Sequence, residues 1–363
     1  MDINAKLQEV CKGFRIDSTY IGYELIQVGN VNKTYRVKFL LPEGNEKSFL
    51  VQNLNTYVFK NPVQVMENID KVTEHIRAKR PGRLALHFHH TTDRKTYIED
   101  GKDFWRMSNF IPSVTHNVVQ NLDIIRNAGR AFGEFQMDLS DFDSTQLHET
   151  IPNFHNTVKR FEALEATVAA DPCGKVAEVR EELDYLFSVR EQACRLTKLW
   201  QEGRLPLRVT HNDTKINNVL FDEAGHNALV VVDLDTVMPG LVGHDFGDAI
   251  RFAANYTEED SADLDAVGVN MDVFRAFTEG FLEMTASTLT EEELNTLALS
   301  SLVLTVELAV RFLDDYIQGS PYFKINYPEH NLVRTRCQIA LAKDMQKKMP
   351  QMEQIVRDCV ARI

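Results

Sequence analysis

Five polar residues that could do chemistry lie in the stretch RVTHNDTKINNVLFDEAGHNALVVVDLDTV, residues 208–237: His211, Asp213, Lys215, Asn218 and Asp233. An aspartate in a loop can orient and deprotonate an attacking hydroxyl. An asparagine five residues later can reach a metal ion on a nucleotide. The spacing therefore indicates phosphoryl transfer, provided that the chain brings Asp233 back toward Asn218.

The residues between Asn218 and Asp233 predict a β-hairpin that does so. Residues 219–221 have strand character, residues 222–225 form a turn, and residues 228–232 return. Because the two strands are similar in length and rise about 3.3 Å per residue, Asn218 and Asp233 can share one Mg²⁺ while Asp213 faces the acceptor. Kinases have this order of catalytic loop, hairpin and metal-binding aspartate.

The run LVVVDLDTV, residues 229–237, has a second interpretation. Haloacid-dehalogenase-type phosphatases also open on an apolar strand that ends in Asp-x-Asp, but they need that strand first in a parallel sheet. Here the later residues show helical periodicity. The acidic pair Asp314-Asp315 lies in a helical pattern, where we expect a solvated face or a partner for Arg311. This context excludes the phosphatase.

The elements that must position the site fall into two groups. Residues 23–53 predict three antiparallel strands with turns at Gly29-Asn30 and PEGNEK, and residues 61–82 predict a helix with Pro62 in its first turn. Residues 84–90 and 95–111 predict further strands. After Pro112, helical periodicity dominates residues 122–139, 157–200 and 248 onward.

We therefore predict an α+β, protein-kinase-like bilobal fold. Residues 1–110 form a small antiparallel β lobe with one long helix, which binds the nucleotide. Residues 111–363 form a larger, mainly helical catalytic lobe, and the connection lies near residues 108–113.

Composition narrows the class of protein. The chain has 363 residues, 44% hydrophobic and 26% charged, which suits a globular bilobal enzyme. A net charge of −13 argues against nucleic acid as a partner. Five scattered cysteines without C-x-x-C spacing suit a reducing cytoplasm. The sequence contains no long uncharged apolar run, so we expect neither export nor membrane insertion. We expect a cytoplasmic monomer.

The chain closely resembles the N-acetylhexosamine 1-kinases of the aminoglycoside phosphotransferase and choline kinase superfamily. The likeness runs through GNVNKTYRV, AGRAFGEFQ, LRVTHNDTKINNVL, VVDLDTVMPG and YPEHNLVRTR. It implies phosphorylation of the anomeric hydroxyl of N-acetylglucosamine or N-acetylgalactosamine, with ATP and Mg²⁺. The resemblance also assigns Asp213 as base, Asn218 and Asp233 as metal ligands, and Arg311 and Tyr322 to the sugar. Asn30 stands where the family commonly has His, which bears on sugar preference.

Other positions have weaker signals. For the nucleotide we expect Gly29 and Asn32 over the phosphates, and the backbone of Asn109 and Ile111 at the adenine edge. Gln52 occupies the place of the usual phosphate-binding lysine of strand three, so we expect Lys215 to supply a cation to the γ-phosphoryl group instead. The alternative for Lys215 is a solvated surface side chain.

Four further titratable residues near the loop have a structural interpretation beside a chemical one. His211 either carries a proton or, as we favour, fixes Asp213. Asp235 either lies in a second layer around the metal or closes the DLDT turn. Asp245 and Asp248 are expected to cap a following helix.

Two alternative functions remain open. One is another small-molecule hydroxyl kinase, for an aminoglycoside, choline or homoserine. The other is a non-catalytic nucleotide-binding module, which the missing strand-three lysine would suit.

Overall fold

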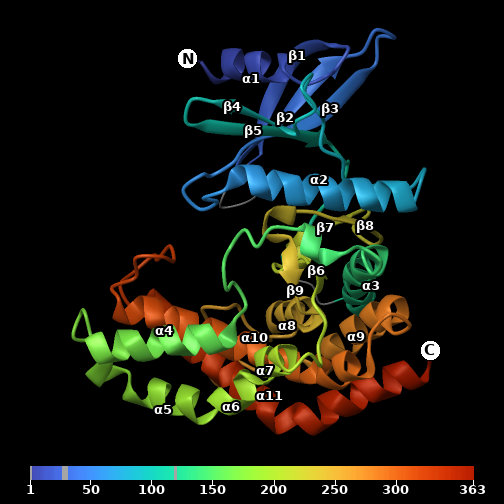
Figure 1. Cartoon of the computed structure of the whole chain (residues 1–363). Coiled ribbons are helices and arrows are strands. Elements are labelled where there is room, and N and C mark those ends of the chain that lie inside the picture. The colour runs from blue at the N-terminus through green and yellow to red at the C-terminus, as the bar shows by residue number, and fades with distance from the viewer. Residues whose placement is uncertain (1, 27–31, 118–120) are drawn as a thin grey trace.

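A five-stranded antiparallel sheet forms the upper lobe in Figure 1, in a computed structural model that describes residues 2–26, 32–117 and 121–363. The strand order is β1-β2-β3-β5-β4. The bounds are β1 (Thr19–Ile26), β2 (Lys33–Leu40), β3 (Glu46–Asn53), β4 (Tyr97–Asp100) and β5 (Asp103–Asn109). The predicted three-stranded start is confirmed, while the Gly29-Asn30 turn lies outside the described residues.

Two helices accompany the sheet. Helix α1 (Ile3–Lys12) packs with Leu7 and Val10 in the same apolar cluster as Val37 and Trp105 of the sheet. Helix α2 (Pro62–Lys79) confirms the predicted long helix, with Pro62 in its first turn and an apolar face buried between the sheet and the lower lobe.

The strand predicted at residues 84–90 is wrong in extent, because only Phe88 forms a β-bridge, with Ser108. His89 N and His87 O do bond to Met107 O and Asn109 N. Beyond them, however, the Asn109 side chain accepts from His87 N at 2.8 Å and donates to Ala85 O at 3.1 Å. An amide side chain thus replaces the backbone partners that would have extended the strand.

The lower lobe is mainly helical, as predicted. Its helices are α3 (Leu122–Asp138), α4 (Thr157–Ala170), α5 (Arg180–Ser188), α6 (Arg190–Ala193), α7 (Arg195–Gln201), α8 (Val242–Ala253), α9 (Met271–Thr285), α10 (Glu291–Ile317) and α11 (His330–Ala361). Its short strands are β6 (Arg208–Thr210), β7 (Val219–Phe221), β8 (Ala228–Val231) and β9 (Met238–Gly240). The 3-10 turns are η1 (Ser144–Gln146), η2 (Val176–Glu178), η3 (Ile216–Asn218) and η4 (Leu234–Thr236).

Helix α10 is long and apolar enough to cross a membrane by length and composition, but 78% of its most apolar window is buried inside the protein. It packs against α8 and α11 and carries Leu302, Val306 and Leu313 in the core. We therefore assign it to the core of the lower lobe.

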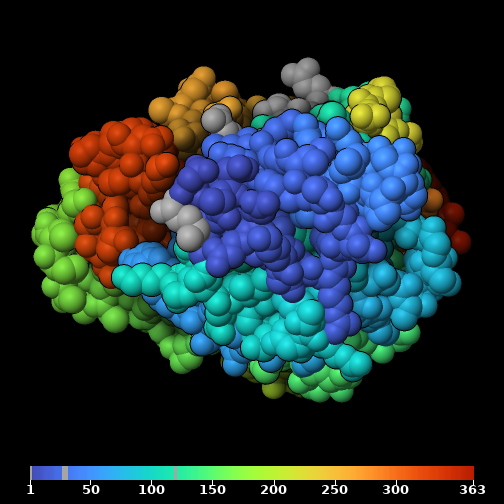
Figure 2. Space-filling view, turned by 90° about the horizontal axis from the view of Figure 1, so that it is seen from above, coloured from blue at the N-terminus to red at the C-terminus, as the bar shows by residue number. Residues whose placement is uncertain are grey.

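The two lobes meet above the short strands. Seen from above in Figure 2, the N-terminal lobe covers the centre of the molecule, and the orange-red connection between α10 and α11 reaches the surface at its side. Strands β6 to β9 lie directly below α2 in Figure 1, so the residues expected to do chemistry lie where the lobes face each other.

Candidate active site

The loop that carries Asp213 runs from β6 to η3 and is fastened by a carboxylate from α8. Asp245 Oδ2 accepts from His211 N at 2.9 Å, and Asp245 Oδ1 accepts from Asn212 N at 2.8 Å. Asn212 has a φ of 63°, a left-handed conformation that asparagine tolerates better than most residues. Burial raises the pKa of Asp245, and its bonds to the loop oppose that rise.

A second carboxylate from α8 fixes the next residue of the loop. Asp248 Oδ2 accepts from Thr214 N at 3.0 Å, and Asp248 Oδ1 accepts from Arg251 Nη2 at 2.8 Å. Burial acts to raise the pKa of Asp248, but Arg251 and Lys215 outweigh it and lower the pKa. The predicted helix-capping role of Asp245 and Asp248 is wrong, because α8 already begins at Val242 and both carboxylates bond to the loop.

His211 lies in the interior beneath this loop. Its Nε2 donates to Val232 O at 2.8 Å, and its Nδ1 accepts from Asp213 N at 3.3 Å. These bonds suit a neutral imidazole, in which one nitrogen donates and the other accepts. The geometry therefore favours a role in fixing Asp213 over proton transfer.

The hairpin brings the two expected metal ligands together. Strands β7 and β8 pair Val219 with Val231, and Val232 N donates to Asn218 O at 2.9 Å. Asp233 follows with a φ of 60°. Its pKa is raised to about 6, by displacement of water around it and then by the negative charges of Asp235 and Asp213.

These residues suit a hard cation. Asn218 Nδ2 donates to Asp213 O at 2.8 Å and approaches Asp213 Oδ2 at 3.2 Å, so the amide oxygen is the end directed elsewhere. An amide oxygen and a carboxylate are ligands that Mg²⁺ prefers. Within residues 2–26, 32–117 and 121–363, no group of three or more His, Cys, Asp or Glu could hold a metal, so phosphate oxygens would have to complete the site.

Lys215 lies beside Asp213, with Nζ 3.1 Å from Asp213 Oδ1. Burial acts to lower the pKa of Lys215, but Asp213 and Asp248 raise it above its ordinary value. Lys215 is therefore a fully charged cation next to the expected base, although 38% of its side chain stays exposed.

On the nucleotide side, Gln52 is occupied by neighbours in the sheet. Its Nε2 donates to Thr34 Oγ1 at 3.0 Å, and its Oε1 accepts from Arg106 Nε at 2.9 Å. Asn32 Nδ2 donates to Asp235 Oδ2 at 2.7 Å. Gly29 and Asn30 lie outside the described residues.

Asp235 makes a contact that neither of its two interpretations included. It is buried and forms an ion pair with Arg106 of β5, so it joins the lower lobe to the sheet. Arg106 was not singled out from the sequence, and an isolated arginine in a strand gives no signal of such a partner.

The connection between the lobes holds the expected adenine-edge residues. The backbone N of Asn109 donates to His87 O, and Ile111 O accepts from Ser113 Oγ at 2.8 Å. The Arg36 guanidinium lies 4.3 Å from the centre of the Phe110 ring. These contacts fix the backbone path at the place expected to meet the base.

The expected acceptor residues lie on the connection beyond α10. The Arg311 guanidinium lies 5.3 Å from the Phe154 ring centre and 5.5 Å from that of Phe323, and Tyr322 packs edge-on to Phe323. Asp315 is buried and accepts from the backbone N of Tyr322 at 2.8 Å. The predicted solvated or Arg311-paired Asp315 is therefore wrong, because this carboxylate holds the loop that carries Tyr322.

Two cavities flank the loop that carries Asp213. One of about 850 Å³ reaches Ile216 and is lined by Arg251, Glu259, Asp260 and Arg334 among others. The other, of about 340 Å³, reaches Asn212 and is lined by Phe154, His155 and Trp200 among others. Neither is lined by Arg311 or Tyr322, although Arg311 packs on Phe154 at the edge of the smaller cavity.

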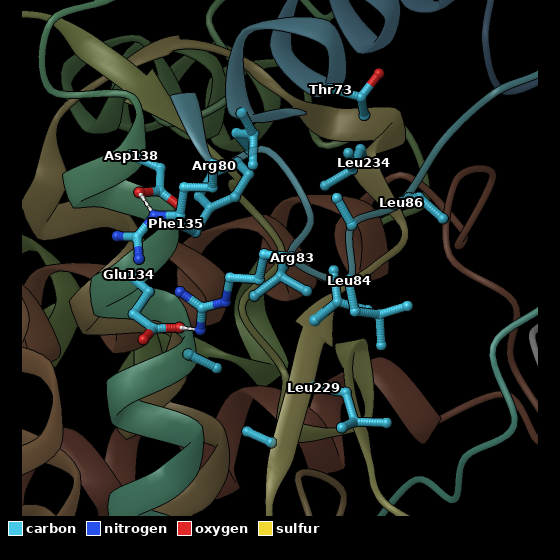
Figure 3. Close-up of a pocket in the computed structure, with 16 residues that line it drawn as sticks. Thr73, Arg80, Arg83, Leu84, Leu86, Glu134, Phe135, Asp138, Leu229 and Leu234 are labelled. Atoms are coloured by element: carbon cyan, nitrogen blue, oxygen red, sulfur yellow. Dashed lines mark hydrogen bonds and ion pairs between the residues drawn. The ribbon is translucent and has the colours of Figure 1, made fainter. Parts of the chain in front are cut away.

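A third cavity, of about 70 Å³, lies behind the hairpin (Figure 3). Leu229 and Leu234 form part of its apolar lining. Arg80 and Arg83 extend from the end of α2 to Asp138 and Glu134 on α3, with N–O distances of 2.5 and 2.6 Å. These ion pairs form a second junction between the lobes.

Comparison with known proteins places this site in a family. The model of a phosphotransferase enzyme family matches residues 39–277. Among solved structures, an aminoglycoside phosphotransferase from Alicyclobacillus acidocaldarius is 11% identical, with 97% of this chain and 96% of that chain covered and a TM-score of 0.62. A microcompartment-associated aminopropanol kinase is 14% identical, with 95% and 98% covered and a TM-score of 0.64.

A choline kinase from Cryptosporidium parvum is 14% identical, with 98% and 99% covered and a TM-score of 0.56. At these identities the solved structures show the fold, which confirms the predicted protein-kinase-like architecture.

Proposed function

The chain belongs to the phosphotransferase enzyme family, and we propose that it transfers the γ-phosphoryl group of ATP to the anomeric hydroxyl of an N-acetylhexosamine. Transfer to a small-molecule hydroxyl follows from the family and the fold. The sugar, the position of the phosphate and the roles of single residues are the proposal.

In this mechanism Asp213 accepts the proton of the attacking hydroxyl. Asp245 and Asp248 hold the loop on both sides of it, so its carboxylate is positioned before substrate binds. Lys215 stands 3.1 Å from Asp213 and is available to stabilise negative charge on the transferred group. Asn218 and Asp233 would hold Mg²⁺, which neutralises charge on the phosphates when bound.

The observation that carries the choice of acceptor is the pairing of acidic side chains around the loop. Asp248 and Glu259 both bond to Arg251, and Asp260 lies 2.9 Å from His330 Nε2. Glu307 accepts from Thr157 Oγ1 at 2.6 Å and contacts His155 at 2.8 Å. Glu258 at the larger cavity is exposed. Apart from Glu258, each of these acids is ion-paired or hydrogen-bonded within the protein, so the surroundings suit a neutral polyol better than a cationic amine.

The arrangement also supports catalysis over mere nucleotide binding. A binding module has no chemical need for a hydroxyl-orienting aspartate, yet two buried carboxylates are used to fix the backbone around Asp213. Burying ionisable groups is unfavourable unless they are paired or hydrogen-bonded. The use of two buried carboxylates to fix this loop therefore supports a catalytic role for Asp213.

The test is a set of parallel reactions with ATP, Mg²⁺ and one acceptor each: N-acetylglucosamine, N-acetylgalactosamine, choline, homoserine and an aminoglycoside. We expect ADP release with an N-acetylhexosamine, and phosphorus NMR should place the phosphate on the anomeric oxygen. A sugar 6-phosphate, or transfer only to an amine-bearing acceptor, would refute the proposal.

A matched pair of variants tests the base. Asp213→Asn should keep nucleotide binding and lower kcat at least about 100-fold, the usual range for general-base loss. Asp265→Asn makes the same change at an exposed position and should leave kcat unchanged. Unchanged turnover in Asp213→Asn would contradict the assigned role.

A further inference from the structure

Strand β3 has Gln52 in place of the usual phosphate-binding lysine, so another group must position the residues expected to bind the nucleotide. Thr34, Gln52 and Arg106 are direct cross-strand partners on β2, β3 and β5, and their side chains bond in a row. Gln52 therefore uses both ends of its amide within the protein. The cation in this row is Arg106, one strand further along the sheet.

Arg106 connects that row to the metal-binding segment. Its Nη1 pairs with Oδ1 of Asp235, two residues after Asp233, and each of these side chains is 3% exposed. The other carboxylate oxygen, Asp235 Oδ2, accepts from Asn32 Nδ2 at 2.7 Å. Asn32 Oδ1 accepts in turn from Asn55 N at 3.0 Å, beyond β3. The buried Asp235 carboxylate thus connects Arg106 of β5 with Asn32, the residue that immediately precedes β2.

The end of the same segment is also tied to the upper lobe. Asn68 of α2 donates from Nδ2 to Val237 O at 2.9 Å and to His148 O at 2.8 Å. The residues that follow Asp233 are therefore held at Asp235 by the sheet and at Val237 by α2. Movement of the sheet against the hairpin would break these contacts, so the spacing between Gln52 and Asp233 depends on them.

We propose that the buried Arg106–Asp235 pair takes over the positioning task that the strand-three lysine and its helix glutamate perform in protein kinases. Arg106 is a positioning residue: it sets Gln52, Asn32 and Asp233 at the separation that a metal–nucleotide complex requires. A planar guanidinium suits this task, because it can bond to Gln52 and Asp235 in different directions at once.

This inference rests on the proposed nucleotide and metal binding, but not on the identity of the acceptor. The experiment is therefore a calorimetric titration of a non-hydrolysable ATP analogue with Mg²⁺, without acceptor, alongside a thermal unfolding midpoint for each variant. If no sugar is phosphorylated while the titrations behave as expected, the acceptor proposal fails and the positioning role stands.

Three variants separate positioning from stability. Arg106→Met should weaken binding of the analogue at least tenfold. Arg106→Met/Asp235→Asn removes both charges with little change of shape, so it should regain the unfolding midpoint while its affinity stays low. Arg83→Met, at the exposed junction, should keep wild-type affinity within twofold.

Arg106→Lys provides a check that retains the charge. It should fold and bind with intermediate affinity, because an ammonium does not reproduce the fork of the guanidinium. Wild-type affinity in the double variant would overturn the proposal, since the pair would then serve stability alone. Wild-type affinity in a folded Arg106→Met would overturn it as well.

Discussion

Among the ion pairs that join the lobes in the described part of the chain, two junctions differ in how far water reaches them. The front junction, Arg106 with Asp235, has side chains that are each 3% exposed. At the back junction, the side chains of Arg83 and Glu134 are 41% and 25% exposed, and those of Arg80 and Asp138 are 27% and 8%. A buried charge tolerates only a paired arrangement, whereas water can replace an exposed partner. The front junction can therefore fix the position of the sheet relative to the lower lobe. The more exposed back junction is expected to contribute less to that positioning.

The largest difference should appear in stability when Arg106 is replaced. Arg106→Met leaves Asp235 buried without its cation, so the free energy of unfolding should fall by about 3–5 kcal/mol. Chemical denaturation measures this change. The double variant with Asp235→Asn should recover most of the loss, and a loss below about 1 kcal/mol in the single variant would contradict the buried ion pair.

An intermediate effect is expected at Arg80. Its replacement by Met leaves Asp138, which is 8% exposed, without its charged partner. We expect a loss of about 1–3 kcal/mol in the free energy of unfolding, the usual range for a buried polar group left unpaired. A loss equal to that of Arg106→Met would remove the distinction between the two junctions.

The pH dependence of metal binding probes Asp233, whose pKa is raised by burial and then by the charges of Asp235, at the front junction, and Asp213. Asp233 has a pKa of about 6, and its neutral form is a poor cation ligand. Affinity for Mg²⁺ with the ATP analogue should therefore fall as the pH drops below 6, by about tenfold per pH unit, and level off above it. Asp235→Asn removes a repelling carboxylate, so its midpoint should lie at lower pH in the same titration. An unshifted midpoint would show that Asp235 does not act on Asp233.

The smallest effect is expected at Arg83. Because water reaches both partners of this pair, Arg83→Met should change the free energy of unfolding by about 0.2–1 kcal/mol. High salt should reduce the contribution further. A loss above about 2 kcal/mol would mean that the back junction holds the lobes as firmly as the front.

Local pattern sufficed for much of the fold. The alternation in residues 33–53, the proline start of α2 and the returning hairpin depend on neighbours within a few residues, and each is confirmed. The strand at 84–90 failed because the Asn109 side chain, more than 20 residues away, supplies the bonds that a strand would have made with backbone.

The candidate site divides in the same way. His211, Asp213 and Asn218 lie in one short loop, and a hairpin adds Asp233, so their closeness follows from spacing. The helix-capping role predicted for Asp245 and Asp248 was wrong. The loop amides that these carboxylates bind are more than 30 residues away in the chain, and local periodicity gives no sign of such distant partners.

By itself, the sequence determined the hairpin and the set of groups that we propose for phosphoryl transfer, since both depend on short-range spacing. Only the tertiary structure decided the meaning of Asp235, whose partners Arg106 and Asn32 are 129 and 203 residues away in the chain. The Asp235 carboxylate links the lobes because burial removes competing water, so that Arg106 and Asn32 are left to hydrogen-bond to it. That condition is a property of the packed molecule and cannot be read from the DLDT segment.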